Sequence, residues 1–153
     1  MDDIDELTVI FTKTYWSPFS WLIRYMLPRN RFALARSSHC YIVGDNDEVY
    51  EAVFPQGVRK QHISKALKND TVVKTITYKV IYRNAAINFL ENQIGKKYDL
   101  RAADGLGLPI ERDWNDPSDW YCYELAAAAL KAAGLDIFNE LSHITETALF
   151  SLK

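Results

Sequence analysis

Residues 119–134 read DWYCYELAAAALKAAG, and this stretch decides the fold. The alanine-rich run in its middle strongly favours helix, because alanine has the highest helix propensity. Ser118 and Asp119 are candidate N-caps, and Gly134 is a candidate stop after the last turn. The pattern therefore predicts a helix with Cys122 in its first turn.

Cys122 has two interpretations. The unpaired N–H groups and the positive end of a helix favour thiolate over thiol, so a cysteine in the first turn is a candidate nucleophile when the chain also holds a histidine. The alternative is structural, because free cysteine is among the most buried residue types. Cys122, Leu125 and Ala129 share a helical spacing that suits a core-facing stripe. The helix alone favours the structural interpretation, and the rest of the chain shifts the balance.

Residues 37–54, SSHCYIVGDNDEVYEAVF, hold the second informative pattern. Two β-prone runs flank a Gly-Asp-Asn-Asp turn, which is typical of a β-hairpin. With residues 44–46 as the loop, His39 stands directly opposite Glu51, and both side chains point to the same face. The hairpin would then hold a carboxylate against an imidazole. A register change of one residue would undo that contact, and a lone histidine in a strand is more often structural.

Cys40 follows His39 in the first of these runs. Successive side chains of a strand point to opposite faces, so we expect only one of the two to reach a given site. We assign His39 to the site and Cys40 to packing. The same direction argument, together with a reducing compartment, disfavours a disulfide between Cys40 and Cys122.

Four further segments complete the expected architecture. They are a strand over Leu7–Phe11, a helix over Ser17–Met26, a strand over Thr71–Val80 and an amphipathic helix over Arg83–Ile94. A long irregular stretch, residues 99–117, precedes Cys122 and should form one wall of any site there. His62 is expected at the surface without a partner, and His143 has no carboxylate or cysteine near it in the sequence.

Composition narrows the class of protein. A chain of 153 residues with 48% hydrophobic residues can form a real core, and we expect a single domain over residues 1–153. The net charge is −2 and no basic stripe is present, which argues against nucleic-acid binding. Two cysteines and three histidines without ligand spacing do not suggest a metal centre, so no metal or organic cofactor is expected.

Targeting signals are not visible in the sequence. The acidic N-terminus has no positively charged region followed by an apolar one, and no apolar run is long enough to cross a membrane. We therefore expect a cytoplasmic protein without a membrane span. Export, or association with a virion by another route, stays open, and so does the oligomeric state.

The order of these motifs resembles a known family. The ordered set is similar to that of the circularly permuted NlpC-like cysteine hydrolases, papain-like proteins of the YiiX type that are distantly similar to lecithin–retinol acyltransferases. The resemblance runs from about Thr8 to Leu149, and the histidine precedes the cysteine, as it does in the permuted group. The motifs that carry it are Ser38-His39, Glu51, Gly95-x-x-Tyr98-Asp99 and Tyr121-Cys122-x-Glu124-Leu125.

The resemblance implies a fold and a set of site residues. The fold would be α+β and permuted papain-like, with an antiparallel sheet of about four to six strands packed against the helices. Cys122 would be the nucleophile, His39 its general base and Glu51 the residue that orients the imidazole. The backbone N–H of Cys122 would be one oxyanion donor, and Tyr98 would line the substrate site.

Two positions depart from the family pattern. The residue after the cysteine is usually small, whereas this chain has Tyr123, which we expect to line the substrate site and to narrow the cleft or alter specificity. The residue after the histidine is usually aliphatic, whereas this chain has Cys40. Neither change removes a catalytic group.

The expected function is a cysteine hydrolase of the peptidase or amidase type. A thiolate would attack the carbonyl carbon, and an acyl-enzyme would be resolved by water. The substrate would be a peptide or an amide, with peptidoglycan stem peptides the class most typical of the family. Two alternatives stay open: a non-catalytic binding or structural module with a papain-like fold, such as a bacteriophage particle component, and an acyltransferase or lipid-amide hydrolase.

Overall fold

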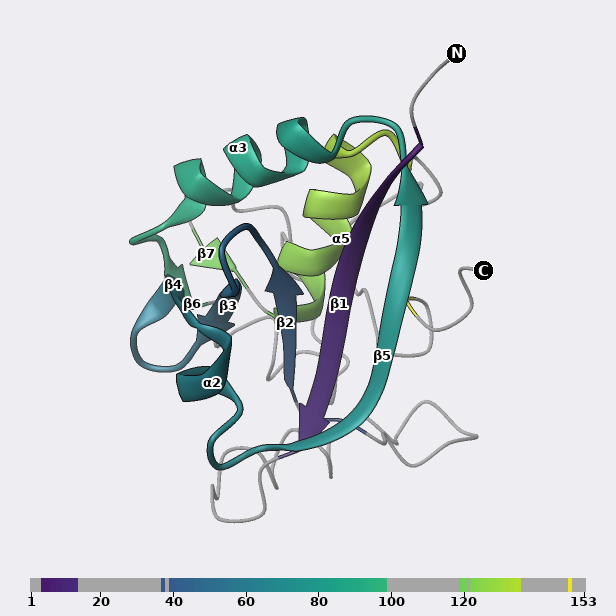
Figure 1. The fold of residues 1–153 in the computed structure, drawn as a ribbon. Helices are drawn as coiled ribbons and strands as arrows, with labels where there is room; N and C mark the ends of the chain where they lie inside the picture. Colours follow the sequence, from purple (N-terminus) through teal and green to yellow (C-terminus); the bar gives the residue numbers. More distant parts are fainter. Residues whose placement is uncertain are drawn as a thin grey trace, which may run out of the picture.

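Strand β2 lies in the middle of a five-stranded antiparallel sheet with the strand order β4-β3-β2-β1-β5 (Figure 1). The computed structural model describes residues 4–13, 37, 39–98, 119–120, 122–135 and 149. The sheet consists of β1 (Asp5–Lys13), β2 (His39–Val43), β3 (Glu48–Val53), β4 (Gly57–His62) and β5 (Thr71–Val80). The other elements are α2 (Ile63–Ala66), α3 (Arg83–Gln93), α5 (Cys122–Ala132) and the short parallel pair β6 (Lys97–Tyr98) and β7 (Asp119–Trp120). The fold class is therefore α+β, as expected.

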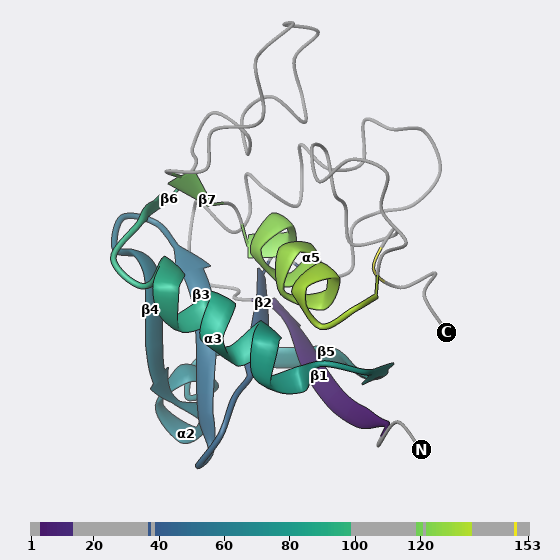
Figure 2. The same ribbon diagram turned by 90° about the horizontal axis from the view of Figure 1, so that it is seen from above.

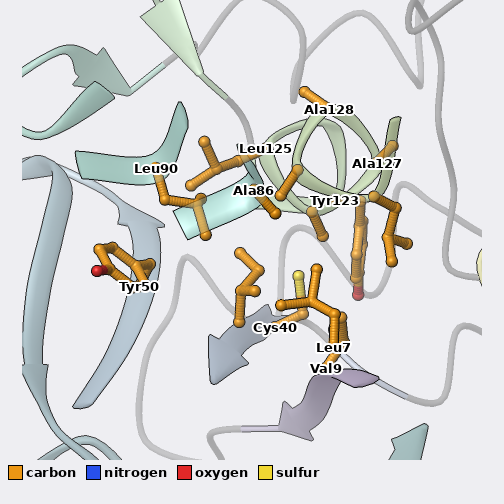
Figure 3. Close-up of a cluster of buried hydrophobic side chains, with 14 of the residues drawn as sticks. Leu7, Val9, Cys40, Tyr50, Ala86, Leu90, Tyr123, Leu125, Ala127 and Ala128 are labelled. Atoms are coloured by element: carbon orange, nitrogen blue, oxygen red, sulfur yellow. The ribbon is translucent and has the colours of Figure 1, made fainter. Parts of the chain in front are cut away.

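The sheet separates two clusters of buried side chains. The main cluster lies between the sheet and the helices α3 and α5, which lie on the same side of the sheet (Figure 2). Cys40 and Ile42 of β2 belong to this cluster, and Figure 3 shows Cys40 between the strands and α5. Tyr41, between them in the sequence, belongs to a second cluster with Val49 and with Ala66 of α2. Because neighbouring strand residues point to opposite faces, the two clusters lie on the two faces of the sheet.

Helix α5 is buried on all sides along most of its length. Every residue from Cys122 to Leu130 is buried, so burial on this helix extends beyond the core-facing stripe considered for Cys122. The run of four alanines explains how this is possible, since small side chains let neighbouring elements approach the helix axis closely. The first charged side chain exposed to solvent on α5 is that of Lys131, in its last turn.

The two ends of α5 differ in how well the sequence predicted them. Gly134 adopts a φ of 92°, and the backbone N–H of Leu135 donates to the carbonyl of Leu130 at 3.0 Å, which confirms the expected glycine stop. At the other end, Asp119 belongs to strand β7, and the helix begins only at Cys122. Asp119 therefore does not occupy the N-cap position, and Ser118 lies outside the described residues.

The loop between β2 and β3 is longer than expected. It spans residues 44–47, and its last two positions, Asn46 and Asp47, adopt φ values of 54° and 58°. Asparagine and aspartate tolerate this left-handed region better than other non-glycine residues, which explains the sequence of the turn.

The longer loop changes the register of the hairpin. Val43 pairs with Val49, so Tyr41 falls opposite Glu51 when the register is continued. The expected direct pairing of His39 with Glu51 is therefore wrong by two residues. Because strand side chains alternate with a period of two, this shift leaves both side chains on the same face of the sheet.

Strand β4 brings polar side chains beside Glu51. The turn at Gly57 has a φ of 80°, and a β-carbon there would collide with the backbone of Lys96. The backbone of Val58 exchanges hydrogen bonds with Gly95 and Lys96, at 2.9 and 2.8 Å, which ties β4 to the segment that enters β6. The close approach at Gly57 thus fixes the edge of the sheet that carries part of the site.

The other expected segments fall into two groups. The strand Thr71–Val80 and the helix from Arg83 are confirmed, and β1 extends the expected Leu7–Phe11 strand by two residues at each end. The expected helix over 17–26, the loop over 99–117 and His143 lie outside the described residues. Within the described part of the chain, no helix has the length and apolar character needed to cross a membrane.

Candidate functional site

Glu51 is the centre of a buried polar cluster. Its side chain is 1% exposed, and its Oε2 atom lies 2.7 Å from Nε2 of His39. Its Oε1 atom accepts a hydrogen bond from Nε of Arg59 at 2.7 Å and another from Nε2 of Gln61. A buried carboxylate needs partners of this kind, because an unpaired charge away from water is very costly.

Three adjacent strands bring these four residues together. His39 is the first residue of β2, and Glu51 lies in the neighbouring strand β3. Arg59 of β4 is directly paired with Glu51, and Gln61 lies two residues further along β4. Residues two apart in a strand point to the same face, so Arg59 and Gln61 both reach the carboxylate.

The electrostatics of the site couple the His39 ring to the Cys122 thiol, because each of the two groups shifts the pKa of the other. Because Nε2 of the ring faces Glu51, the nitrogen left for Cys122 is Nδ1. The edge of the His39 ring packs against the Tyr41 ring, with centroids 4.7 Å apart and an interplanar angle of 89°. The imidazole is thus held by contacts on several sides.

The pKa values of the histidine and the cysteine move in opposite directions. Burial lowers the pKa of His39, but hydrogen bonds and charges from Cys122 and Glu51 outweigh it and raise the pKa to about 10. Burial raises the pKa of Cys122, but hydrogen bonds from Cys40 and His39 and the charge of His39 lower it to about 6. Between these values the favoured state is a thiolate beside an imidazolium.

Glu51 keeps its negative charge in this environment. Burial alone would raise the pKa of the carboxyl, but the hydrogen bonds and charges of His39 and Arg59 outweigh it and lower the pKa. The cluster then holds charges of alternating sign along Cys122, His39, Glu51 and Arg59. Such an order lets each buried charge face an opposite one, which offsets much of the cost of burial.

Cys122 is the first residue of helix α5 and is 1% exposed. Backbone N–H groups in the first turn of a helix have no acceptor within the helix. They and the positive end of the helix dipole therefore favour negative charge at this position. The helix terminus and the His39 ring act in the same direction on the thiol.

Cys40 also contacts Cys122, contrary to the assignment of Cys40 to packing alone. The Cys40 thiol donates to the carbonyl oxygen of Cys122 at 3.2 Å, and its interaction with Cys122 also lowers the pKa of the Cys122 thiol. Neither cysteine is in a disulfide, and both are buried. His39 is the terminal residue of β2, so at this end of the strand the alternation of faces does not keep His39 and Cys40 from reaching the same residue.

The structure describes the side chain of only one of the two tyrosines expected to line the substrate site. Tyr123 is fully buried, its hydroxyl lies 2.8 Å from Oγ of Ser37, and its ring packs near Phe11 (Figure 3). The structure thus places Tyr123 in the core between α5 and the sheet, and its role in lining a substrate site stays a prediction. Tyr98 belongs to strand β6, and its side chain lies outside the described part of the structure.

His62 has a local structural role. It is exposed, as expected, but it is not without a partner: its Nδ1 atom accepts from the backbone N–H of Ser64 at 3.2 Å and lies 2.8 Å from Oγ of that residue. His62 therefore caps α2 and stands apart from the polar cluster. Among the described residues, no group of three or more His, Cys, Asp or Glu side chains is placed to hold a metal ion.

Sequence reasoning missed Arg59 and Gln61. The signal was available in the segment Gly57-Val58-Arg59-Lys60-Gln61-His62, where a glycine turn after Pro55 opens a third antiparallel strand. A hairpin there places Arg59 opposite Glu51, and the period of two adds Gln61 to the same face. No strand was expected over this segment in the sequence analysis, so neither residue was placed beside Glu51.

Comparisons of the chain with models of protein families, with curated proteins and with solved structures found no match. The chemistry inferred for this site therefore rests on the geometry of Cys122, His39 and Glu51 and on the electrostatics of their surroundings.

Proposed function

We propose that this protein is a cysteine hydrolase of the peptidase or amidase type with a permuted papain-like fold. In this proposal Cys122 is the nucleophile, His39 is the general base and acid, and Glu51 orients the imidazole. The observation that carries the proposal is the 2.7 Å contact between the Glu51 carboxylate and the His39 ring. The same ring is electrostatically coupled to the thiol of Cys122, which is the first residue of helix α5.

The proposed reaction has two halves. The Cys122 thiolate attacks the carbonyl carbon of the substrate, and the developing oxyanion is stabilised by backbone N–H groups at the start of α5. The imidazolium of His39 gives its proton to the leaving amine as the carbon–nitrogen bond breaks, and an acyl-enzyme thioester remains. His39 then takes a proton from water, the hydroxyl attacks the thioester carbon, and the carboxylic product leaves Cys122 as a thiolate again.

The geometry supports each of these roles. Glu51 accepts from Nε2 of His39, which leaves Nδ1 for Cys122 and fixes the plane of the ring. The charge of Glu51 also favours imidazolium, which must form next to the thiolate. We propose peptidoglycan stem peptides as the first substrate class to examine, and this choice follows from the resemblance of the motifs.

A non-catalytic module with the same fold is the second candidate, and the burial of Cys122 favours it. The Cys122 side chain is 1% exposed, and buried cysteines are often inert. The buried Glu51–His39 pair and its electrostatic coupling to Cys122 favour the enzyme, because a purely structural core has no need of a buried charged cluster.

Trapping of the acyl-enzyme tests the proposal. The wild-type protein and Cys122→Ala are incubated with peptidoglycan fragments and with a series of simple acyl esters and amides, and intact mass and products are followed by mass spectrometry. The proposal expects products and an acyl adduct on Cys122 in the wild type, with neither in the variant. Equal product formation by both proteins, or the absence of any adduct and product across the whole series, contradicts it.

A further inference from the structure

The carboxylate of Glu51 is held more firmly than contact with His39 alone requires. Oε2 faces the imidazole, whereas Oε1 accepts from both Arg59 and Gln61 of the next strand. Rotation of the carboxylate about its last side-chain bond would break both of these hydrogen bonds at once. The two β4 side chains therefore select the one orientation in which Oε2 points at Nε2 of His39.

We propose that Arg59 and Gln61 are positioning residues that hold Glu51 in line with the His39 ring. This inference rests on the proposed function, since it concerns the same Cys122–His39 pair. Neither β4 residue is expected to touch the substrate. Both act through Glu51, and their effect is measured as a change in the ionisation of the Cys122 thiol.

The two positioning residues contribute in different ways. Gln61 is neutral, so it fixes the direction of the carboxylate and favours the ionised form through its hydrogen bond alone. Arg59 adds a positive charge that helps Glu51 to stay ionised, although its side chain is 40% exposed and its charge is partly screened by solvent. The direct pairing of Arg59 with Glu51 across the two strands makes this contact a product of the sheet register.

Lys60 supplies a matched control from the same strand. It lies between the two positioning residues in the sequence, so its side chain points to the other face of the sheet. Its Nζ atom contacts Glu91 at 2.7 Å and Glu48 at 3.2 Å, and neither of these belongs to the site. Lys60→Gln therefore removes a nearby positive charge without touching Glu51.

The experiment measures the rate of carbamidomethylation of Cys122 against pH, with the modified peptide quantified by mass spectrometry. The variants are Gln61→Leu, Arg59→Gln and Arg59→Lys, with Lys60→Gln as the control and circular dichroism to show that each is folded. We expect the midpoint of the rate profile to rise by about one pH unit or more in Gln61→Leu and Arg59→Gln. At a pH below the new midpoint, a rise of one unit lowers the fraction of Cys122 present as thiolate by about tenfold. The midpoint of Arg59→Lys should lie between those of the wild type and Arg59→Gln, because lysine keeps the positive charge but lacks the planar donor group of arginine.

The outcomes separate this inference from the proposed function. The positioning role is overturned if the folded Gln61 and Arg59 variants have the same low midpoint of Cys122 alkylation as the wild type. The hydrolase proposal would still stand after that result. A shift in Lys60→Gln as large as in Gln61→Leu also overturns it, since the effect would then be one of general charge or stability. A wild-type midpoint at the value of an ordinary thiol would instead count against the hydrolase proposal itself.

A different observation, the contact between the two cysteines, carries a second inference. The Cys40 thiol lies 3.2 Å from the carbonyl oxygen of Cys122, and its interaction with Cys122 also lowers the pKa of the Cys122 thiol. Neither cysteine is in a disulfide, and both belong to the main buried cluster. A reactive thiolate with a second thiol in contact is the arrangement in which an oxidised sulfur can be trapped as a disulfide.

We infer that a peroxide converts Cys122 and Cys40 into a reversible disulfide. The Cys122 thiolate attacks one peroxide oxygen, the oxygen–oxygen bond breaks, and Cys122 becomes a sulfenic acid while the second oxygen leaves and is protonated to water or an alcohol. The Cys40 sulfur then attacks the Cys122 sulfur, its proton and the sulfenic hydroxyl leave as water, and the sulfur–sulfur bond forms. The two thiols together supply the two electrons that reduce the peroxide. The nucleophile is thereby shielded from further oxidation until a dithiol restores it.

Hydrogen peroxide and intact-mass measurement test this inference on the wild type, Cys40→Ala and Cys122→Ala. We expect the wild type to lose the mass of two hydrogen atoms and to recover both thiols with dithiothreitol. Cys40→Ala should instead gain two oxygen atoms on Cys122, as a sulfinic acid that dithiothreitol does not reverse. A sulfinic acid on Cys122 in the wild type at the same rate, or no reaction in either protein, overturns the inference. The mass measurement needs no hydrolase substrate, so its result is independent of the test of the proposed function.

Discussion

Oε2 of Glu51 lies 2.7 Å from Nε2 of His39 even though the two residues are not directly opposite in their hairpin. The register places Tyr41 opposite Glu51 instead, and the contact runs diagonally across two strands. A diagonal contact of this kind needs the carboxylate to lean in one direction along the sheet. Arg59 and Gln61 supply the constraint from the other side, so the site is a property of three strands and not of the hairpin alone.

Glu51→Gln should reduce activity without abolishing it. The amide keeps the size of the side chain but loses the charge that favours imidazolium, so the pKa of His39 falls and that of Cys122 rises. We expect kcat/KM on an acyl substrate to fall on the order of 10²- to 10⁴-fold. Wild-type kcat/KM in the folded variant would show that the Glu51 charge has no part in the chemistry.

The same variant should change the response of stability to acid. The pKa of Glu51 lies below its ordinary value of 4.5 in the folded protein, so its contribution to stability is present above that value and is lost as the pH falls through the lowered pKa. Glu51→Gln has no such group. Urea unfolding from pH 5 down to pH 2 should therefore show a shallower loss of stability in the variant, and parallel curves for the two proteins would refute the assigned shift.

Gly57 and Gly95 form a matched pair for a test of the sheet edge. Both have positive φ, but a β-carbon at Gly57 would collide with the backbone of Lys96, whereas one at Gly95 meets no atom within 4 Å. Gly57→Ala should cost on the order of 3 kcal/mol and Gly95→Ala about 1 kcal/mol, the conformational cost alone. Equal shifts of the urea midpoint in the two variants would show that the close approach of β4 to the segment before β6 does not matter.

Tyr41→Phe should separate stability from the state of the site. The Tyr41 hydroxyl donates to Oδ2 of Asp70 at 2.6 Å and lies 3.2 Å from the carbonyl of Ala66, so its loss should cost about 1–2 kcal/mol of unfolding free energy. The phenylalanine ring keeps the edge contact with His39. We expect a lower melting temperature with an unchanged rate of Cys122 labelling at pH 7. A slower labelling rate would mean that the hydroxyl network reaches the imidazole.

Much of the fold follows from local pattern. The strand Thr71–Val80 alternates and ends at a helix with a clear stop, and Gly134 ends α5 as its position predicts. These features depend on short stretches of chain, where propensity and periodicity decide the outcome. The fully buried environment of α5 could not be predicted in this way, because it depends on which distant elements surround the helix.

In the site too, some features follow from local sequence pattern and others depend on distant parts of the chain. The face shared by His39 and Glu51 followed from the period of two, which survives a register error of two residues. The register itself depended on the length of the loop at 44–47, and the partners of Glu51 depended on recognising β4 as a strand. The contact of Cys40 with Cys122 arises at the end of a strand, where alternation no longer separates two neighbours.

The pH dependence of Cys122 alkylation by iodoacetamide, compared between the wild type and His39→Ala, tests the central claim most directly. In the wild type the pKa of Cys122 is lowered to about 6, so the rate should rise through that pH and stay high toward the pKa of His39 at about 10. His39→Ala removes the imidazolium, and the midpoint should move up toward the ordinary thiol value of about 8.5. A wild-type midpoint near that ordinary value, unchanged in His39→Ala, would contradict the thiolate–imidazolium pair on which the proposed chemistry depends.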